Sequence, residues 1–123
     1  MALADPQSVT INAIAISLPR VTSQVANGNL YKASDGNTDL TVSHSVTSKG
    51  RLRHNVRLHT RKVAADPLTS TSNSIYDMSC QITIDVPPYG YTVAEAKLVV
   101  QGLLDALSAS TYSLTTKVLG GEA

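Results

Sequence analysis

Residues 51–63 read RLRHNVRLHTRKV and residues 40–47 read LTVSHSVT, and both stretches alternate between apolar and polar side chains. Successive side chains of a β-strand point to opposite faces of the sheet, so the alternation predicts two strands that are each apolar on one face. Lys49-Gly50 supplies a turn between them. The apolar face is expected to carry Leu40, Val42, His44, Val46, Leu52, His54, Val56, Leu58 and Thr60.

A third alternating stretch runs from Ile75 to Val86 and stops at Pro87-Pro88, which cannot continue a ladder of hydrogen bonds. The segment before it, Asp66 to Asn73, is predicted to be a loop because it is rich in Asp, Pro, Ser, Thr and Asn. The apolar face of the strand predicted over Ile75 to Val86 is expected to carry Tyr76, Met78, Cys80, Ile82, Ile84 and Val86. Three successive strands are therefore expected to be apolar on one side only.

The N-terminal part predicts a β-hairpin and the beginning of a meander. Ser8 to Leu18 is rich in β-branched residues and is predicted as a strand that ends at Pro19. Turn signals follow at Asn27-Gly28 and Asp35-Gly36-Asn37, with a short apolar piece between them.

The hydrophobic period changes from two to about 3.6 after Gly90. Thr92 followed by Glu95 forms a capping box, so a helix is predicted from Val93 to about Ser108. Ser110-Thr111 can cap a second, short helix that ends at Leu119, before Gly120-Gly121. The first helix is expected to bury Ala96, Val99, Val100, Leu103, Leu104 and Leu107.

These elements predict an α+β fold in one domain over residues 1–123, with the sheet over about 8–86 and two helices over about 92–119. The core is expected to be aliphatic and small, because the chain has no Phe or Trp. One long and one short helix cover little of a sheet, so the helices of a second subunit are expected to complete the cover in an interlocked dimer.

Several classes of protein are not expected. The one cysteine, Cys80, excludes an internal disulfide and is expected to be a small core residue. No signal peptide or membrane-spanning run is present, so a soluble, cytosolic protein without a membrane partner is expected. No metal site or cofactor site is expected either, since no acidic residue stands at a suitable spacing from a histidine.

The charge distribution predicts the functional face. Net charge is only +1, but six of the ten Lys and Arg residues lie within 49–62, and no acid occurs between Asp39 and Asp66. Arginine suits phosphates and can stack on bases, while hydroxyls and amides suit base edges. The RNA-binding residues are predicted to be Thr41, Ser43, Ser45, Thr47, Arg51, Arg53, Asn55, Arg57, His59, Arg61, Ser79 and Gln81. The bland alternative is a solvated face that only limits aggregation.

The histidines leave a catalytic alternative open. His44 and His54 share the apolar side, where core or interface roles are expected, and His59 lies on the polar side. A small enzyme that uses His59 with Asp77 or Asp85 is the weakest hypothesis, and no enzyme is expected. A cellular dimeric regulator that binds nucleic acid is a further alternative.

The order of elements resembles the coat proteins of single-stranded RNA bacteriophages. The resemblance covers nearly the whole chain and rests on TVSHSVT, RLRHNVRLHTRKV and MSCQITIDVP followed by GYTVAEAKLVVQGLLDAL. It implies dimers whose sheets join edge to edge, with helices crossing the partner, and an icosahedral virion assembled in the bacterial cytoplasm. It also implies that the polar face lines the interior, packages the RNA genome and binds an RNA hairpin to repress replicase translation.

By position, the resemblance assigns Thr41, Ser43, Ser45 and Thr47 to the first RNA-facing strand, Asn55 and Arg57 to the second, and Asp77 and Ser79 to the last. One residue departs from the family pattern: Asp77 stands where well-known members place an aromatic residue that stacks on a base. The loop Asp66 to Asn73 resembles the segment that meets its copies around the symmetry axes.

Overall fold

Strands β5 (Thr38–Val46) and β6 (Leu52–Ala65) form the antiparallel pair that the alternation predicts. Their register places Leu40 opposite Leu58 and Thr41 opposite Arg57, so apolar residues face apolar ones across the pair. The turn at Lys49-Gly50 is confirmed, because Gly50 has a φ of 79° and its amide donates to the Thr47 carbonyl. One face of the pair is therefore apolar and the other polar.

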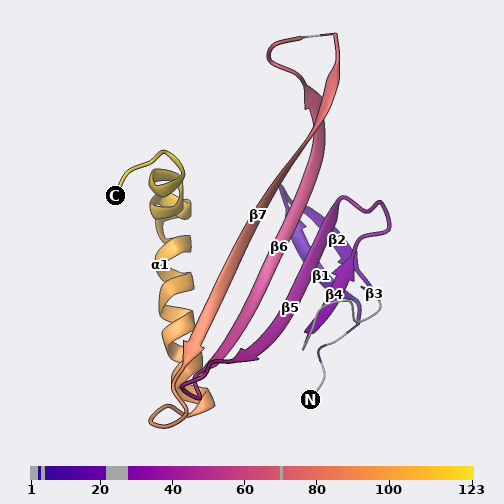
Figure 1. The fold of residues 1–123 in the computed structure, drawn as a ribbon. Helices are drawn as coiled ribbons and strands as arrows, with labels where there is room; N and C mark the ends of the chain where they lie inside the picture. Colours follow the sequence, from indigo (N-terminus) through magenta and orange to yellow (C-terminus); the bar gives the residue numbers. More distant parts are fainter. Residues whose placement is uncertain (1–2, 4, 22–27, 70) are drawn as a thin grey trace. The chain divides into compact units, whose positions relative to one another are not determined.

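This pair lies within a five-stranded sheet of order β3-β4-β5-β6-β7, which also contains β3 (Arg20–Val21), β4 (Gly28–Lys32) and β7 (Asn73–Val86) (Figure 1). The computed structural model describes residues 3, 5–21, 28–69 and 71–123. The chain forms two compact units, Met1–Asp85 and Val86–Ala123, and the sheet lies in the first unit. Strands β6 and β7 continue past the end of β5 as a two-stranded arm (Figure 1).

The N-terminal β-hairpin is present, but its turn is not where the sequence predicted it. A single strand over Ser8–Leu18 is wrong, because β1 (Gln7–Ile11) and β2 (Ile14–Leu18) form a separate two-stranded sheet. Asn12 and Ala13 between them have φ values of 52° and 62°, which is the geometry of a two-residue hairpin turn. Of the turn predicted at Asn27-Gly28, Asn27 lies outside the described residues.

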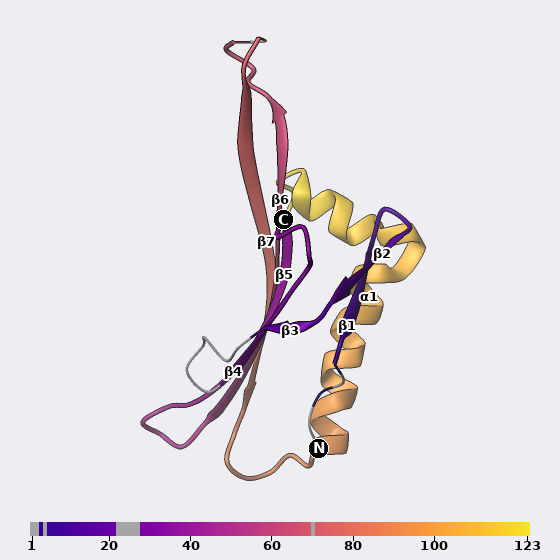
Figure 2. The ribbon, with the colours of Figure 1, turned by 90° about the vertical axis from the view of Figure 1, so that its right-hand side faces the viewer.

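The core lies between this hairpin and the first strands of the large sheet. Figure 2 shows β1 and β2 on one side of that sheet. Leu18 and Tyr31 are fully buried and Ala33 nearly so, with Val9, Ile16, Leu40 and Val42 packed against them. The prediction of a purely aliphatic core is wrong, since Tyr31 is its largest residue.

Several other residues of the apolar face are exposed. Val46 and Met78 are 67% and 60% exposed, and Cys80, which was predicted to be a core residue, is exposed as well. Within the first unit the strands therefore present exposed apolar residues.

The second unit contains helix α1 (Val93–Leu119). Thr92 caps it as predicted, since its Oγ1 accepts a hydrogen bond from the Glu95 amide at 3.2 Å, and Gly120 ends it. Two separate helices are not confirmed. The single helix instead contains a break over residues 109–112, where Ser110, Thr111 and Tyr112 have positive φ values.

The burial predicted for the helix is wrong for the single chain. No residue of α1 is buried, and Val99 and Leu103 are 63% and 53% exposed. Within its own unit the helix therefore carries apolar residues that are not buried.

Gly28 and Gly102 provide a test of packing in β4 and in α1. A Cβ at Gly28 would collide with the Val42 carbonyl of β5, so Gly28→Ala is expected to lower the free energy of unfolding by about 1–3 kcal/mol. Gly102→Ala is the control: its Cβ would meet nothing within 4 Å, and the helix should gain up to about 1 kcal/mol. Urea unfolding midpoints measure both changes. Unchanged stability in Gly28→Ala would contradict the β4–β5 pairing, and a loss in Gly102→Ala would reveal a close approach of another element.

Candidate nucleic-acid interface

The register of β5 and β6 brings most of the predicted RNA-binding residues onto one face. Thr41, Ser43 and Ser45 lie opposite Arg57, Asn55 and Arg53. Thr47 and Arg51 follow at the turn, where the Thr47 amide donates to the Arg51 carbonyl and the Arg51 amide donates to Thr47 Oγ1 at 3.2 Å. Hydroxyls, an amide and guanidinium groups therefore alternate across two strands.

Strand β7 adds its polar residues to the same face. The His59 ring is hydrogen-bonded to Asp77 at 3.1 Å, and Arg51 donates to Asp85 at 3.0 Å. Arg51 lies as far before His59 as Asp85 lies after Asp77, as antiparallel neighbours require. Alternation then places Ser79 and Gln81, between the two aspartates, on this face too.

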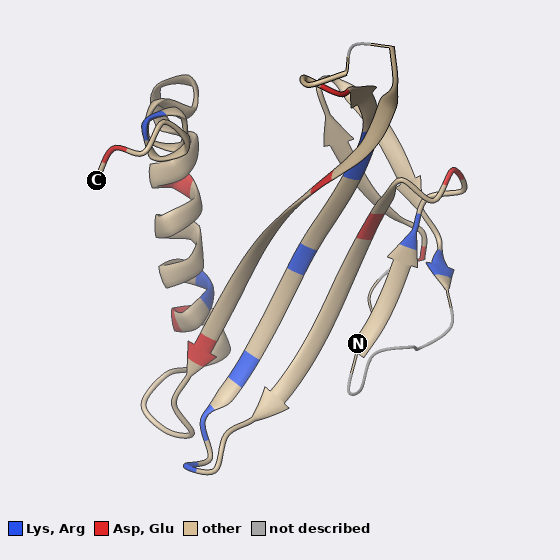
Figure 3. Cartoon of the chain, turned by 45° about the horizontal axis from the view of Figure 1, so that its top comes forward, with Lys and Arg blue, Asp and Glu red and all other residues tan. Residues whose placement is uncertain are grey.

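The polar face contains acidic residues beside the basic segment predicted over residues 49–62. Acids are absent along β6, but Asp39, Asp77 and Asp85 enter from the neighbouring strands (Figure 3). Asp85 lies 3.0 Å from Arg51 Nε and 4.0 Å from Arg53 Nε. Residue spacing along one strand could not reveal these ion pairs, because they form between strands.

The four arginines of the face differ in how much of their charge is free. Arg61 donates from Nη2 to the Gly36 carbonyl at 3.2 Å, and Arg51 is held by Asp85. Arg53 has only the long contact to Asp85. Within the described parts of the chain, Arg57 has no ion pair, and its side chain is exposed. Arg57 and Arg53 are therefore the cations most available to a ligand.

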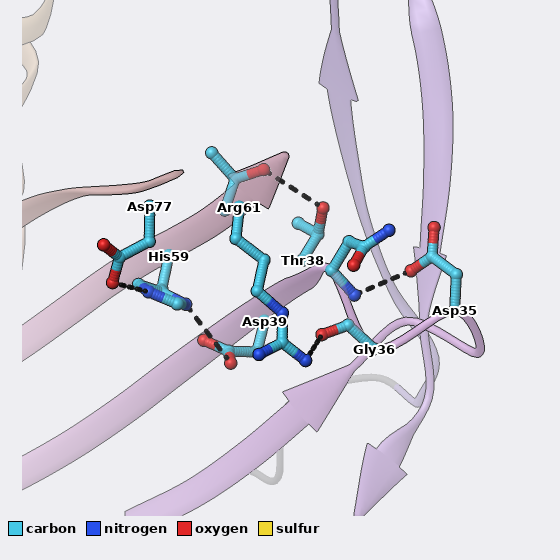
Figure 4. A network of polar contacts seen from close by, with 9 residues as sticks. Asp35, Gly36, Thr38, Asp39, His59, Arg61 and Asp77 are labelled. Carbon is cyan, nitrogen blue, oxygen red and sulfur yellow. Dashed lines mark hydrogen bonds and ion pairs between the residues drawn. The ribbon is translucent and has the colours of Figure 1, made fainter. Parts of the chain in front are cut away.

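His59 lies between two carboxylates from the strands on either side of it (Figure 4). Its Nδ1 is 3.6 Å from Asp39 Oδ2, and its Nε2 is 3.1 Å from Asp77 Oδ2. The hydrogen bond from His59, helped by the charges of His59 and Arg57, lowers the pKa of the Asp77 carboxyl below its ordinary value. The three side chains thereby link β5, β6 and β7 across the polar face.

The geometry agrees only in part with the catalytic alternative, a small enzyme that uses His59 with Asp77 or Asp85. His59 contacts Asp77, whereas Asp85 is held by arginines instead. Among the side chains that the structure describes, no hydroxyl or thiol is hydrogen-bonded to His59, so no nucleophile is activated there. Asp39 was missed as a member of the site, although the alternation one step before Leu40 places it on the polar face.

Histidines 44 and 54 lie on the apolar face, as predicted, and contact each other. Their Nδ1 atoms are 2.8 Å apart and their rings meet edge to face at 5.0 Å. Neither is buried, so they are surface residues of the single chain.

One further polar group of this face bears on binding. Asn55 Oδ1 is buried and has no hydrogen-bond partner among the described residues. The described residues contain no group of three or more His, Cys, Asp or Glu side chains arranged to hold a metal ion. They also contain no helix that is both long and apolar enough to cross a bilayer.

The match to a family model defines the class of protein, which is a phage coat protein. The chain belongs to the phage phiCb5 coat protein family, whose model matches residues 4–85. It is a capsid subunit of a virion and not an enzyme. No match is found among curated proteins.

Solved virus-like particles have the same fold. That of Beihai levi-like virus 21 is similar with a TM-score of 0.75 and 12% identity, over 99% of this chain and 98% of that one. For bacteriophage AVE019 the TM-score is 0.73 and the identity 10%, over 89% and 90% of the chains. For bacteriophage NT-214 they are 0.71 and 14%, over 99% of each chain.

The contact between His59 and Asp77 predicts a specific pH dependence. Because the hydrogen bond favours the ionised carboxylate, its contribution to stability is complete above the ordinary pKa of 3.8 and is lost as the pH falls through the lowered pKa. Asp77→Asn is expected to be less stable than the natural protein near neutral pH, and the difference should vanish in strong acid. Thermal unfolding across this range measures it, with Asp105→Asn in α1 as the control. A difference that does not change with pH would contradict the contact.

Proposed function

We propose that this coat protein forms homodimers that close into an icosahedral shell and package single-stranded RNA against the polar sheet face. The observation that carries the proposal is the division of the sheet into an open apolar face and a polar face with exposed arginines. The first face needs a protein partner and the second suits a polyanion.

The dimer part rests on exposed apolar surface. Val46, Val56 and Met78 on the sheet and Leu98, Val99 and Leu103 on α1 are all more than a third exposed. Monomeric proteins rarely leave so much apolar surface open. In the proposed dimer the two sheets join edge to edge, and α1 of each subunit crosses the partner's apolar face. The break at 109–112 divides α1 into two arms. In the proposed dimer these two arms have the role of the two helices expected from the sequence.

The RNA part rests on the charges that remain free. Asp85 partly neutralises Arg51 and Arg53, while Arg57 has no ion pair among the described residues. Phosphate contacts require positive charge and little else, so general packaging is expected to depend most on Arg57 and Arg53. Base contacts are proposed for Asn55 and for the hydroxyls of Thr41, Ser43, Ser45 and Ser79; in support, Thr41, Ser43 and Ser45 lie opposite Arg57, Asn55 and Arg53.

Binding of an RNA hairpin, with repression of replicase translation, is proposed for the same face. The position of a stacking aromatic is occupied by Asp77, whose carboxylate is engaged by His59. Asp77 offers no ring to stack on a base, so we infer that hairpin binding here would use arginine and hydroxyl contacts. Assembly is proposed to occur in the cytoplasm of the bacterial host.

The loop between β6 and β7 is proposed to contact its copies around the symmetry axes of the shell. It lies at the end of the two-stranded arm (Figure 1), and Leu68 in it is 94% exposed. Its described part is ordered by local contacts, since Asp66 Oδ1 accepts from the Leu68 amide at 2.9 Å. A fully exposed leucine on an ordered loop suits an apolar contact between subunits.

Charge reversal on the polar face tests the RNA part. Arg53→Glu with Arg57→Glu is expected to give shells depleted of RNA, because the two freest cations become repulsive to phosphate. The ratio of ultraviolet absorbance at 260 and 280 nm of purified particles measures RNA content. The control is Lys97→Glu with Lys117→Glu in α1, which changes the net charge equally. If both double variants retain the RNA content of the natural protein, the polar face is not the packaging surface.

A further inference from the structure

His44 and His54 form a polar pair within the apolar face of the sheet. They lie directly opposite each other in the register of β5 and β6. The opposed pairs on either side of them on this face are aliphatic, namely Val42 with Val56 and Val46 with Leu52. Among the residues that the structure describes, each ring is hydrogen-bonded only to the other histidine. The two imidazoles are therefore not engaged by a carboxylate or a hydroxyl.

The hydrogen-bond pattern of the strands brings these two side chains close together. The Thr47 amide donates to the Arg51 carbonyl, so Thr47 and Arg51 form a hydrogen-bonded pair. Hydrogen-bonded and non-hydrogen-bonded pairs alternate along an antiparallel ladder, and His44 with His54 lies three steps further along it. The histidines are therefore a non-hydrogen-bonded pair, in which the Cα atoms are about 4.5 Å apart instead of about 5.5 Å.

The two rings turn their Nδ1 atoms toward each other. These atoms are 2.8 Å apart, and the rings meet edge to face with centroids 5.0 Å apart. In a pair of neutral rings, one Nδ1–H donates to the lone pair of the other Nδ1. When the donor ring carries its proton on Nε2 instead, both Nδ1 lone pairs are free and no proton has been released. Two imidazole nitrogens are then within reach of a single metal ion.

We propose that His44 and His54 form a two-histidine site for a divalent transition-metal ion, with water in the remaining coordination positions. The site goes beyond the proposed function, because it needs only one chain and no RNA. A bound ion would join β5 to β6 close to their connecting turn. It would lie on the face that is proposed to receive α1 of the partner subunit.

The distance between the two nitrogens favours particular metals. Metal–nitrogen distances of about 2.0–2.1 Å, with nitrogens 2.8 Å apart, give an angle of about 84–89° at the ion. The tetrahedral angle of about 109° that Zn²⁺ prefers would need nitrogens about 3.3 Å apart. Square-planar and tetragonal sites of Cu²⁺ and Ni²⁺ have angles near 90°, and Cu²⁺ stands highest in the order of affinity. We therefore expect Cu²⁺ and Ni²⁺ to bind in preference to Zn²⁺.

Hard cations such as Mg²⁺ have no suitable ligand at this site. They prefer oxygen, and most of all carboxylate oxygen. On β7 the residue beside His54 is Ile82, by the same register that brings Arg51 to Asp85. The aspartates that contact His59 and Arg51 lie on the opposite, polar face. The chemistry of the pair is therefore selective for metals that bind nitrogen.

Nickel titration of RNA-free subunits tests the site. The parent is the untagged full chain with Cys80→Ser, because Cys80 lies on the same face and its thiol also binds transition metals. Isothermal titration calorimetry is expected to show one Ni²⁺ per chain and no binding of Mg²⁺. His44→Gln and His54→Gln, each in this parent, should weaken Ni²⁺ binding by about 10²-fold, because each removes a second ligand that is already held in place. His59→Gln is the matched control and should bind Ni²⁺ as the parent does.

Two measurements separate loss of a ligand from loss of the fold. The thermal unfolding midpoint of the parent should rise with Ni²⁺ concentration, whereas that of a folded His44→Gln variant should not. Circular dichroism without metal shows whether each variant has folded. Pulsed electron paramagnetic resonance of the Cu²⁺-loaded parent counts the coordinated imidazoles without any histidine substitution, and it should show two.

The results that would overturn the site are distinct from those that bear on RNA or on the dimer. Equal Ni²⁺ affinity in the parent and in both folded histidine variants would overturn it, as would binding that depends on His59 alone. A Cu²⁺ spectrum with a single coordinated imidazole would overturn it even if the variants failed to fold. None of these measurements requires the subunit to bind RNA or to dimerise, so the proposed function can fail while this site stands.

Discussion

The side-chain alternation of β5, β6 and β7 is the constraint on which the rest of the structure depends. A strand places alternate residues on opposite faces, so its register decides at the same time which side chains lie on each face. In this chain the alternation gives an apolar face whose Leu40 and Val42 pack against the core beside the N-terminal hairpin, while Val46, Val56 and Met78 of the same face are exposed. The same alternation gathers the hydroxyls, amides and guanidinium groups of three strands on the opposite face. The partner subunit and the RNA binding that we propose thus both rest on one pattern.

The polar face is not a uniform field of positive charge. Three aspartates from the flanking strands engage His59, Arg51 and Arg53, which fixes these side chains and reduces the charge that a folded subunit must accommodate. Arg57 lies between them without an ion pair among the described residues. Exposed ion pairs contribute little to stability, so their main effect here is on which cations remain free for phosphate. A net charge of +1 is then compatible with a surface that binds a polyanion.

Most strands of the sheet could be predicted because each pattern is contained in one short stretch. Long-range and backbone features could not. The turn at Asn12-Ala13 contains no glycine, so it was missed, whereas the break at 109–112 falls where the sequence predicted the boundary between two helices. The ion pairs of Asp39, Asp77 and Asp85 depend on strand register, which the sequence of one strand does not contain. The burial expected for α1 and Cys80 is absent from the single chain, because the surface that would cover them lies on another copy in the proposed assembly.

The most direct test of the account is a cryo-electron-microscopy reconstruction of the particles that the full chain forms. The account predicts shells in which the sheets of two subunits join edge to edge, α1 lies over the partner's apolar face, and RNA density on the inner surface contacts Arg57 and Arg53. A shell whose polar sheet face points outward, or whose RNA density contacts other residues, would contradict it.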